Sequence, residues 1–167
     1  MPANNPIVQI STLLSYLTTL LGLFVLFGWY SHNESLIQIH SSFVPMQYNT
    51  ALGFLLCGLA LLSIRYKQFL VVRITSFLVA LIGIATLFQY LSSVSIGIDQ
   101  LFMEHYITLL SSHPGRMAPN TALCFLISGV AIFLAFSTPS EARTKYFLGT
   151  SGSMVLGLGS IALFGYI

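Results

Sequence analysis

Charged residues are scarce in this sequence. Its 167 residues include only six Lys and Arg and four Asp and Glu, so 6% of the side chains are charged. Ordinary water-soluble domains contain about 25%. So few charges cannot cover the surface of a soluble protein of this size, which argues against a soluble enzyme. They are sufficient for the loops of a membrane protein, because lipid covers the rest of its surface.

Other absences narrow the function further. The net charge is only +2 and no run of basic residues occurs, so nucleic acid is not expected as a partner. The two cysteines, Cys57 and Cys124, lie in apolar stretches, which predicts neither a disulfide framework nor a paired-cysteine metal site. No Ser/His/Asp set, glycine-rich phosphate loop or pair of carboxylates is present. We therefore expect no enzymatic activity in this chain and no resident cofactor.

Long apolar stretches take the place of these features. A helix needs about 20 apolar residues to cross a bilayer. Five stretches meet this requirement, at about residues 11–30, 47–64, 69–92, 118–137 and 147–167. The first is not expected to be a cleaved signal peptide, because residues 1–10 contain no Lys or Arg. The sequence predicts a single all-α integral-membrane domain over residues 1–167, a polytopic transmembrane helical bundle of five spans.

The cations predict the orientation of this domain. Five of the six fall at the two short turns between spans: Arg65, Lys67, Arg73, Arg143 and Lys145. Only Arg116 lies in the longer loops at about residues 31–46 and 93–117. Because cytoplasmic loops carry the excess of Lys and Arg, we expect a cytoplasmic N-terminus and longer loops outside. Ile167 is then also on the outer side.

The sequence repeats internally. Residues 46–60 and 117–131 share the pattern M-x-x-N-T-A-L-x-F-L-x-x-G-x-A, each time at the start of a span. A second pattern, G-x-x-x-L-F-x-[W/Y], closes the outer end of the other spans at residues 22–29, 83–90 and 159–166. The predicted unit is a two-helix hairpin. It is complete at about residues 11–64 and 69–137 and partial at about 147–167. A sixth span is then expected, which predicts that this chain is a fragment; the alternative is a natural five-span protein.

The stretches at residues 117–126 (M-A-P-N-T-A-L-C-F-L) and 97–101 (G-I-D-Q-L) carry a family resemblance. They resemble the multi-span sensor modules at the N-termini of bacterial signalling proteins, mainly sensor histidine kinases and GGDEF diguanylate cyclases, often followed by PAS domains. The resemblance implies a bacterial inner-membrane location and a cytoplasmic effector, in the same chain or as a partner kinase. It implies no ligand.

The duplicated N-T pair provides the first candidate site residues. Asn49, Thr50, Asn120 and Thr121 lie where the returning helices are predicted to begin. One interpretation is capping, in which a short polar side chain accepts a bond from an unpaired N–H of the first turn. The other is a pseudo-symmetric polar pocket at the outer membrane face.

Aromatic and amide side chains close the outgoing spans. Trp29, Tyr90 and Tyr166 are expected to be anchors in the headgroup region, or alternatively walls that stack on a ligand. Gln89 replaces the glycine that the other two units carry at the same position. It is a candidate for contacting a ligand or a neighbouring helix.

All four histidines, His32, His40, His105 and His113, are predicted on the outer side. Imidazole is a ligand for Zn and Cu, and its pKa suits a pH sensor. The spacing does not favour a chelate, however, because no H-x-H or H-x-x-x-H occurs. Ordinary loop histidines are the competing interpretation.

Two further expectations concern packing. Apolar residues recur along residues 98–110 with helical spacing, which predicts an amphipathic helix on the outer surface. The repeated glycines, listed here together, are expected to allow close approach of helices: Gly22, Gly53, Gly58, Gly83, Gly129 and Gly159. Gly149, Ser153 and Gly157 add a ridge of small residues that serves internal packing or the contact of a homodimer.

Together these features predict a membrane-embedded sensory input module that passes a periplasmic or membrane-derived signal to a cytoplasmic kinase or cyclase outside this chain. A small structural or accessory subunit of a membrane complex is the alternative. A transporter is less favoured, because no charged side chain lies deep within a predicted span.

Overall fold

A computed structural model describes residues 5–38, 40, 43–107, 113–137 and 141–164. These residues form helices and loops and no strand. The five long helices are α1 (Pro6–Tyr30), α3 (Tyr48–Arg65), α4 (Phe69–Ser92), α5 (Pro119–Ser137) and α6 (Glu141–Phe164). Two short elements, α2 (Glu34–Ile37) and the 3₁₀ turn η1 (Ile98–Gln100), lie in the longer loops.

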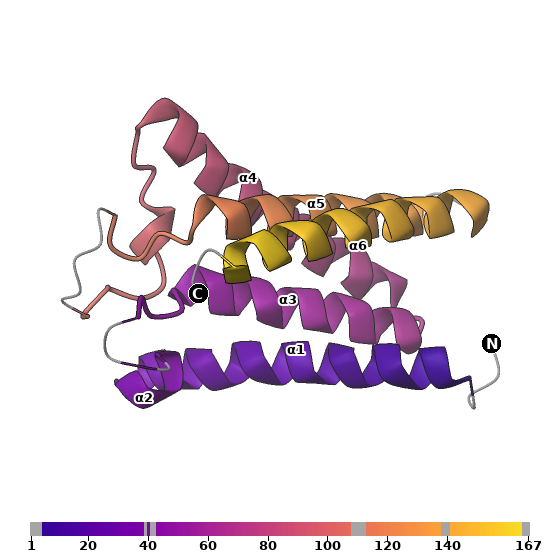
Figure 1. Cartoon of the computed structure of the whole chain (residues 1–167), viewed down its shortest axis with the longest axis horizontal. Coiled ribbons are helices and arrows are strands. Elements are labelled where there is room, and N and C mark those ends of the chain that lie inside the picture. The colour runs from indigo at the N-terminus through magenta and orange to yellow at the C-terminus, as the bar shows by residue number, and fades with distance from the viewer. Residues whose placement is uncertain (1–4, 39, 41–42, 108–112, 138–140, 165–167) are drawn as a thin grey trace.

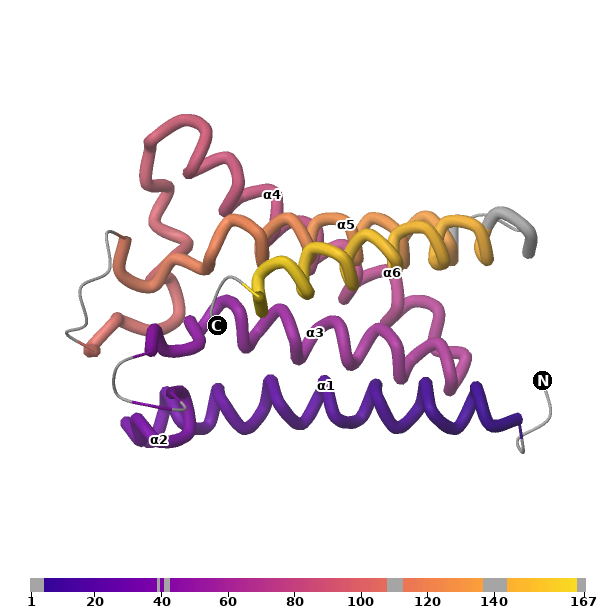
Figure 2. Tube along the Cα trace, viewed as in Figure 1, coloured from indigo at the N-terminus to yellow at the C-terminus, as the bar shows by residue number. Residues whose placement is uncertain are grey.

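Each long helix is long and apolar enough to cross a membrane. The predicted all-α fold with five spans is therefore confirmed, and the predicted boundaries of α4 coincide with the observed ones. The long helices run up and down beside one another (Figure 1). The start of α1, the turn between α3 and α4, the end of α5 and the start of α6 lie at one end, and the described parts of both longer loops lie at the other. Figure 2 follows the same path along the backbone.

The two complete hairpins pack by the same contacts. At Gly22 of α1, an added Cβ would lie 2.7 Å from the carbonyl oxygen of Ala51 and 2.5 Å from the backbone nitrogen of Leu55, both in α3. At Gly83 of α4, an added Cβ would lie 2.6 Å from the carbonyl oxygen of Ala122 and 2.7 Å from the nitrogen of Leu126, both in α5. These are matching positions of the two sequence patterns. The repeat in sequence is therefore a repeat of packing, in which glycine brings two backbones together.

The helix α6 differs from its counterparts. It packs beside α5, and Leu148 contacts a small core of Ala60, Val72 and Ile132. No heavy atom of another described helix lies within 4 Å of a Cβ built at Gly159 or at the other three glycines of α6. The expectation that Gly159 brings two helices together is thus wrong for the described part of the chain. The other glycines of the predicted set, Gly22, Gly53, Gly58, Gly83 and Gly129, all lie against another helix.

The predicted amphipathic helix over residues 98–110 is also wrong as far as the structure describes it. One 3₁₀ turn, Ile98–Gln100, is followed by bends and then by irregular backbone to Ile107, and residues 108–110 lie outside the described residues. The physical reason is the burial of Asp99, which the helical pattern places on an exposed polar face. Its carboxylate has partners that a surface helix would not provide.

Candidate functional site

Three buried polar side chains meet at the loop end of the α4–α5 hairpin, away from the N-terminal end of α1. Gln89 in the last turns of α4 is 0% exposed, Asp99 in η1 is 8% exposed, and Arg116 just before α5 is 9% exposed. Burial of charged and amide groups is costly unless they are paired. Their partners therefore determine how this loop folds.

The Asp99 carboxylate lies at the centre of the group. Its Oδ2 accepts a hydrogen bond of 2.8 Å from Nε of Arg116, which makes a buried ion pair. Its Oδ1 accepts a hydrogen bond of 2.9 Å from the Gln89 side-chain amide. The Gln89 side-chain oxygen in turn accepts the N–H of Ile96 at 2.9 Å. The loop is thus folded back onto the end of α4 by charge-assisted bonds, which are stronger than neutral ones.

The Arg116 guanidinium is also held from one face. Its central carbon lies 5.3 Å from the ring centroid of Tyr90, a cation–π contact. The Tyr90 hydroxyl donates to the carbonyl of Met117 at 3.1 Å. The same ring therefore supports the cation and ties the end of α4 to the start of α5.

Backbone geometry brings the two halves of the loop together. Gly115 has a φ of +79°, which non-glycine residues rarely adopt, and an added Cβ would lie 2.6 Å from the carbonyl oxygen of Asp99. From the first hairpin, the Asn49 side-chain amide donates to the carbonyl of Ile98 at 2.7 Å. Asp99 is therefore bonded to α4, its neighbour Ile98 is bonded to α3, and Arg116 lies just before α5.

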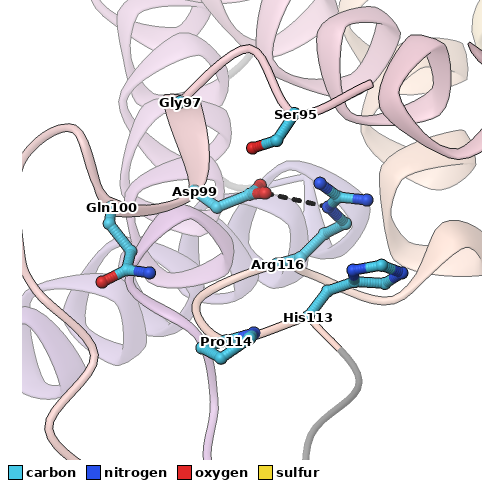
Figure 3. A pocket seen from close by; sticks show the side chains of 7 residues that line it. All are labelled: Ser95, Gly97, Asp99, Gln100, His113, Pro114 and Arg116. Carbon is cyan, nitrogen blue, oxygen red and sulfur yellow. Dashed lines mark hydrogen bonds and ion pairs between the residues drawn. The ribbon is translucent and has the colours of Figure 1, made fainter. Parts of the chain in front are cut away.

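A hollow of about 180 Å³ opens beside the ion pair. Figure 3 shows the side chains that line it, with the guanidinium of Arg116 among Asp99, Ser95 and His113. Gly97, Gln100 and Pro114 complete the lining. A second hollow, of about 310 Å³, lies at the opposite end of the bundle between α1 and α3. None of its lining residues is buried, so the hollow beside Arg116 is the candidate site.

The predicted N-T residues have separate roles. The helix α3 begins at Tyr48, and its capping residue Gln47 makes no side-chain cap bond. Asn49 is therefore inside the first turn, and the capping interpretation is wrong for it because its amide bonds to the neighbouring loop. Asn120 is exposed, and its side-chain oxygen accepts the N–H of Thr121 at 2.9 Å. The side chains of Thr50 and Thr121 are half-buried in the first turns.

The closing aromatics act as links between the helices. The Trp29 indole N–H donates to the carbonyl of Met46 at 2.9 Å, which matches the bond from Tyr90 to Met117 in the second hairpin. Trp29 is 1% exposed, so its ring packs inside the protein and does not face outward as a headgroup anchor would. Its polar N–H is satisfied by the protein instead. Tyr90 is half-buried, and Tyr166 lies outside the described residues.

The four histidines lie beside different aromatic rings. His32 stacks on Tyr106 at 4.5 Å between centroids, and the ring of His105 lies 5.6 Å from that of Trp29. His40 lies beside Phe43, and His113 lies 6.1 Å from Tyr90. Within the described residues, no three His, Cys, Asp or Glu side chains are grouped as metal ligands.

His105 has an unusual environment for a loop histidine. Burial lowers its pKa below the ordinary value, and the backbone of Ile107 partly offsets this effect. The neutral ring is therefore favoured near neutral pH. Tyr106 beside it has a raised pKa, first because of burial and then because of the negative charge of Glu34.

Sequence patterns identified only part of this site. Gln89 was a candidate because it interrupts the repeat, whereas Asp99 and Arg116 were not recognised as a pair. A signal for them does exist: Arg116 is the lone cation of the outer loops, and it shares its loop with few acidic partners.

The site offers one guanidinium with a hydroxyl and an imidazole near it, bordering an open hollow. Such groups can hold an oxygen-bearing anion by hydrogen bonds. Comparison of the chain with protein-family models, with curated proteins and with solved structures finds no match.

Proposed function

We propose that this chain is the membrane-embedded sensory input module of a bacterial signal-transduction protein. It receives a periplasmic or membrane-derived signal and passes it to a cytoplasmic kinase or cyclase. The observation that carries the proposal is the position of the Asp99–Arg116 pair. It borders a hollow at the loop end of the bundle; Asp99 is bonded to Gln89 of α4, and the neighbouring Ile98 is bonded to Asn49 of α3.

The mechanism follows from these connections. A ligand in the hollow that pairs with Arg116 changes the charge seen by Asp99, and Asp99 is bonded to Gln89 of α4. A ligand shifts an equilibrium between two packings only if it binds one of them more tightly. The ion pair is the element whose energy differs between the two, because an anion bound to the remaining edge of the guanidinium weakens the attraction between Arg116 and Asp99. The helices α4 and α5 then transmit the change across the bilayer.

The proposed orientation places the hollow in the periplasm and the N-terminus in the cytoplasm of the bacterial inner membrane. The cations at the short turns, Arg65, Lys67, Arg73 and Lys145 among them, support it. A homodimer belongs to the proposal as well, with α6 at the contact, because its glycine positions are open in the described residues.

Cysteine labelling in intact cells tests the orientation. Ser95→Cys adds an exposed thiol beside the hollow, and Lys67→Cys is the matched variant at a short turn. A membrane-impermeant maleimide is expected to label Ser95→Cys in intact cells and Lys67→Cys only after permeabilisation. The parent chain controls for Cys57 and Cys124. The opposite pattern of labelling would contradict the proposal.

The proposed kinase or cyclase effector is tested by sequencing the gene and its neighbours. The reading frame past Ile167 and the neighbouring genes are expected to encode a kinase or cyclase domain. Deleting the hairpins should then remove the response of that enzyme while leaving its basal activity. A locus with neither domain, together with stable co-purification of a multi-subunit membrane complex, would instead favour the accessory subunit.

A further inference from the structure

We propose that the hollow beside Arg116 binds a small carboxylate anion. This inference deepens the proposed function, and its signalling role rests on that function, because it names the chemical class of the ligand. Binding itself is a property of the chain alone.

The Arg116 side chain has hydrogen-bond donors that the described residues do not use. A guanidinium has five N–H donors and no acceptor. In the described structure only the Nε of Arg116 has a hydrogen-bond partner, the Asp99 carboxylate. The Arg116 side chain is nevertheless only 5% exposed. The terminal nitrogens of Arg116 are not among the fully buried unpaired atoms of the described residues, so they reach the space of the hollow, where a ligand can accept from them.

The groups around the Arg116 guanidinium leave one of its edges free. The Tyr90 ring covers one face of the guanidinium, and Asp99 occupies the Nε side. The edge that remains carries the terminal nitrogens, which are parallel donors. A carboxylate matches such an edge with two acceptor oxygens in one plane. Figure 3 shows the guanidinium among the other lining side chains of the hollow.

The net charge of the site favours a monoanion over a dianion. Arg116 is already paired with Asp99, so the site is close to neutral before a ligand enters. Among the lining residues, His113 is the other side chain able to carry a positive charge. A dianion such as phosphate would lack compensating cations here. A monoanion gains the Arg116 bonds with less repulsion from Asp99.

The size of the hollow suits a small ligand. The hollow of about 180 Å³ is partly open and has room for several water molecules. It therefore admits a small carboxylate such as propionate or lactate. Ser95 and Gln100 border the same space, so a hydroxyl group on the ligand has polar neighbours.

Thermal unfolding of the purified chain in lipid nanodiscs tests the proposal. The probes are propionate and lactate, with propionamide as the uncharged isostere, inorganic phosphate as the dianion, and sodium chloride to match ionic strength. A ligand that binds only the folded state raises the unfolding midpoint in a concentration-dependent way. We expect both carboxylates to raise it, and neither propionamide nor phosphate to do so.

Two variants locate the binding without leaving an unpaired buried charge. Asp99→Asn combined with Arg116→Gln replaces the ion pair by neutral groups, and it should weaken carboxylate binding at least about tenfold, since the charge-assisted bonds are lost. Ser95→Phe fills the hollow while leaving the pair in place. Its matched control is Ser35→Phe, at an exposed serine of the first outer loop. We expect binding to be lost in Ser95→Phe and kept in Ser35→Phe.

The outcomes separate the two proposals. Failure of both carboxylates, equal stabilisation by propionamide, a larger effect of phosphate, or unchanged binding in the neutral double variant would each overturn the carboxylate site. Each of these results concerns the purified chain and leaves the orientation and effector tests standing. Carboxylate binding without any kinase or cyclase at the locus would overturn the sensory function and keep the site.

Discussion

The repeated glycine contact provides the sharpest prediction about the fold. Replacing Gly83 with Ala inserts a Cβ at 2.6 Å from the carbonyl oxygen of Ala122 and 2.7 Å from the nitrogen of Leu126. Both atoms belong to the backbone of α5 and cannot move aside alone, so α4 and α5 must separate. At Gly159, the matching position of α6, no heavy atom of another described helix lies within 4 Å of the new Cβ.

The magnitudes follow from two opposing effects. Overpacking typically costs about 1–3 kcal/mol, and contact with a rigid backbone belongs at the upper end of that range. Alanine in a helix interior gains about 0.5–1 kcal/mol over glycine. Gly83→Ala is therefore expected to lower the free energy of unfolding by about 2 kcal/mol. Gly159→Ala should raise it by up to about 1 kcal/mol.

Denaturant unfolding in mild detergent, followed by circular dichroism, measures both variants. Gly22→Ala is a second test, because its contacts in the first hairpin match those of Gly83. It should destabilise the chain by a similar amount. If Gly83→Ala were as stable as Gly159→Ala, the close contact between α4 and α5 would be refuted.

Three further predictions concern the outer loops. Asp99→Ala leaves the Arg116 charge buried without a partner and should lower the free energy of unfolding by about 3–5 kcal/mol. The double variant Asp99→Asn with Arg116→Gln should lower it much less. Equal losses in the two variants would contradict the buried pair. Asn49→Ala removes the bond to the carbonyl of Ile98 and should lower the free energy of unfolding by about 2 kcal/mol. Asn120→Ala changes an exposed side chain and should lower it by at most about 1 kcal/mol. The reverse order of the two variants in a thermal melt would refute these roles. Because burial lowers the pKa of His105, protonation disfavours the folded state, so stability should fall as pH decreases from about 6.5 through the lowered pKa. The single tryptophan beside it should report the change by fluorescence, and a His105→Gln variant that keeps the same pH dependence would argue against this cause.

The fold was largely predictable because lipid-spanning helices follow composition. Length and apolarity decide where a span lies, and the predicted range 69–92 agrees with α4. The glycine pattern also predicted close helix contacts, which occur at Gly22 and Gly83. The same pattern failed at Gly159, because a sequence motif states that a position is small and does not provide the partner that fills the space.

The loops were harder to predict for a physical reason. Helical spacing over residues 98–110 assumes that polar side chains face water. Asp99 instead gains two hydrogen bonds by turning inward to Gln89 and Arg116, which lie 10 and 17 residues away in the chain. Such pairing depends on how two hairpin ends meet. The role of Asn49 was missed for the same reason, since its partner is in the other hairpin.

The central claim is that the outer end of the second hairpin receives a signal. The direct measurement is the activity of the kinase or cyclase encoded at the locus, in cells that carry Ser95→Phe or the matched Ser35→Phe. We expect carboxylate addition to change this activity in the parent and in Ser35→Phe, whereas Ser95→Phe abolishes the response at the same membrane abundance. An unchanged response in Ser95→Phe would contradict the account.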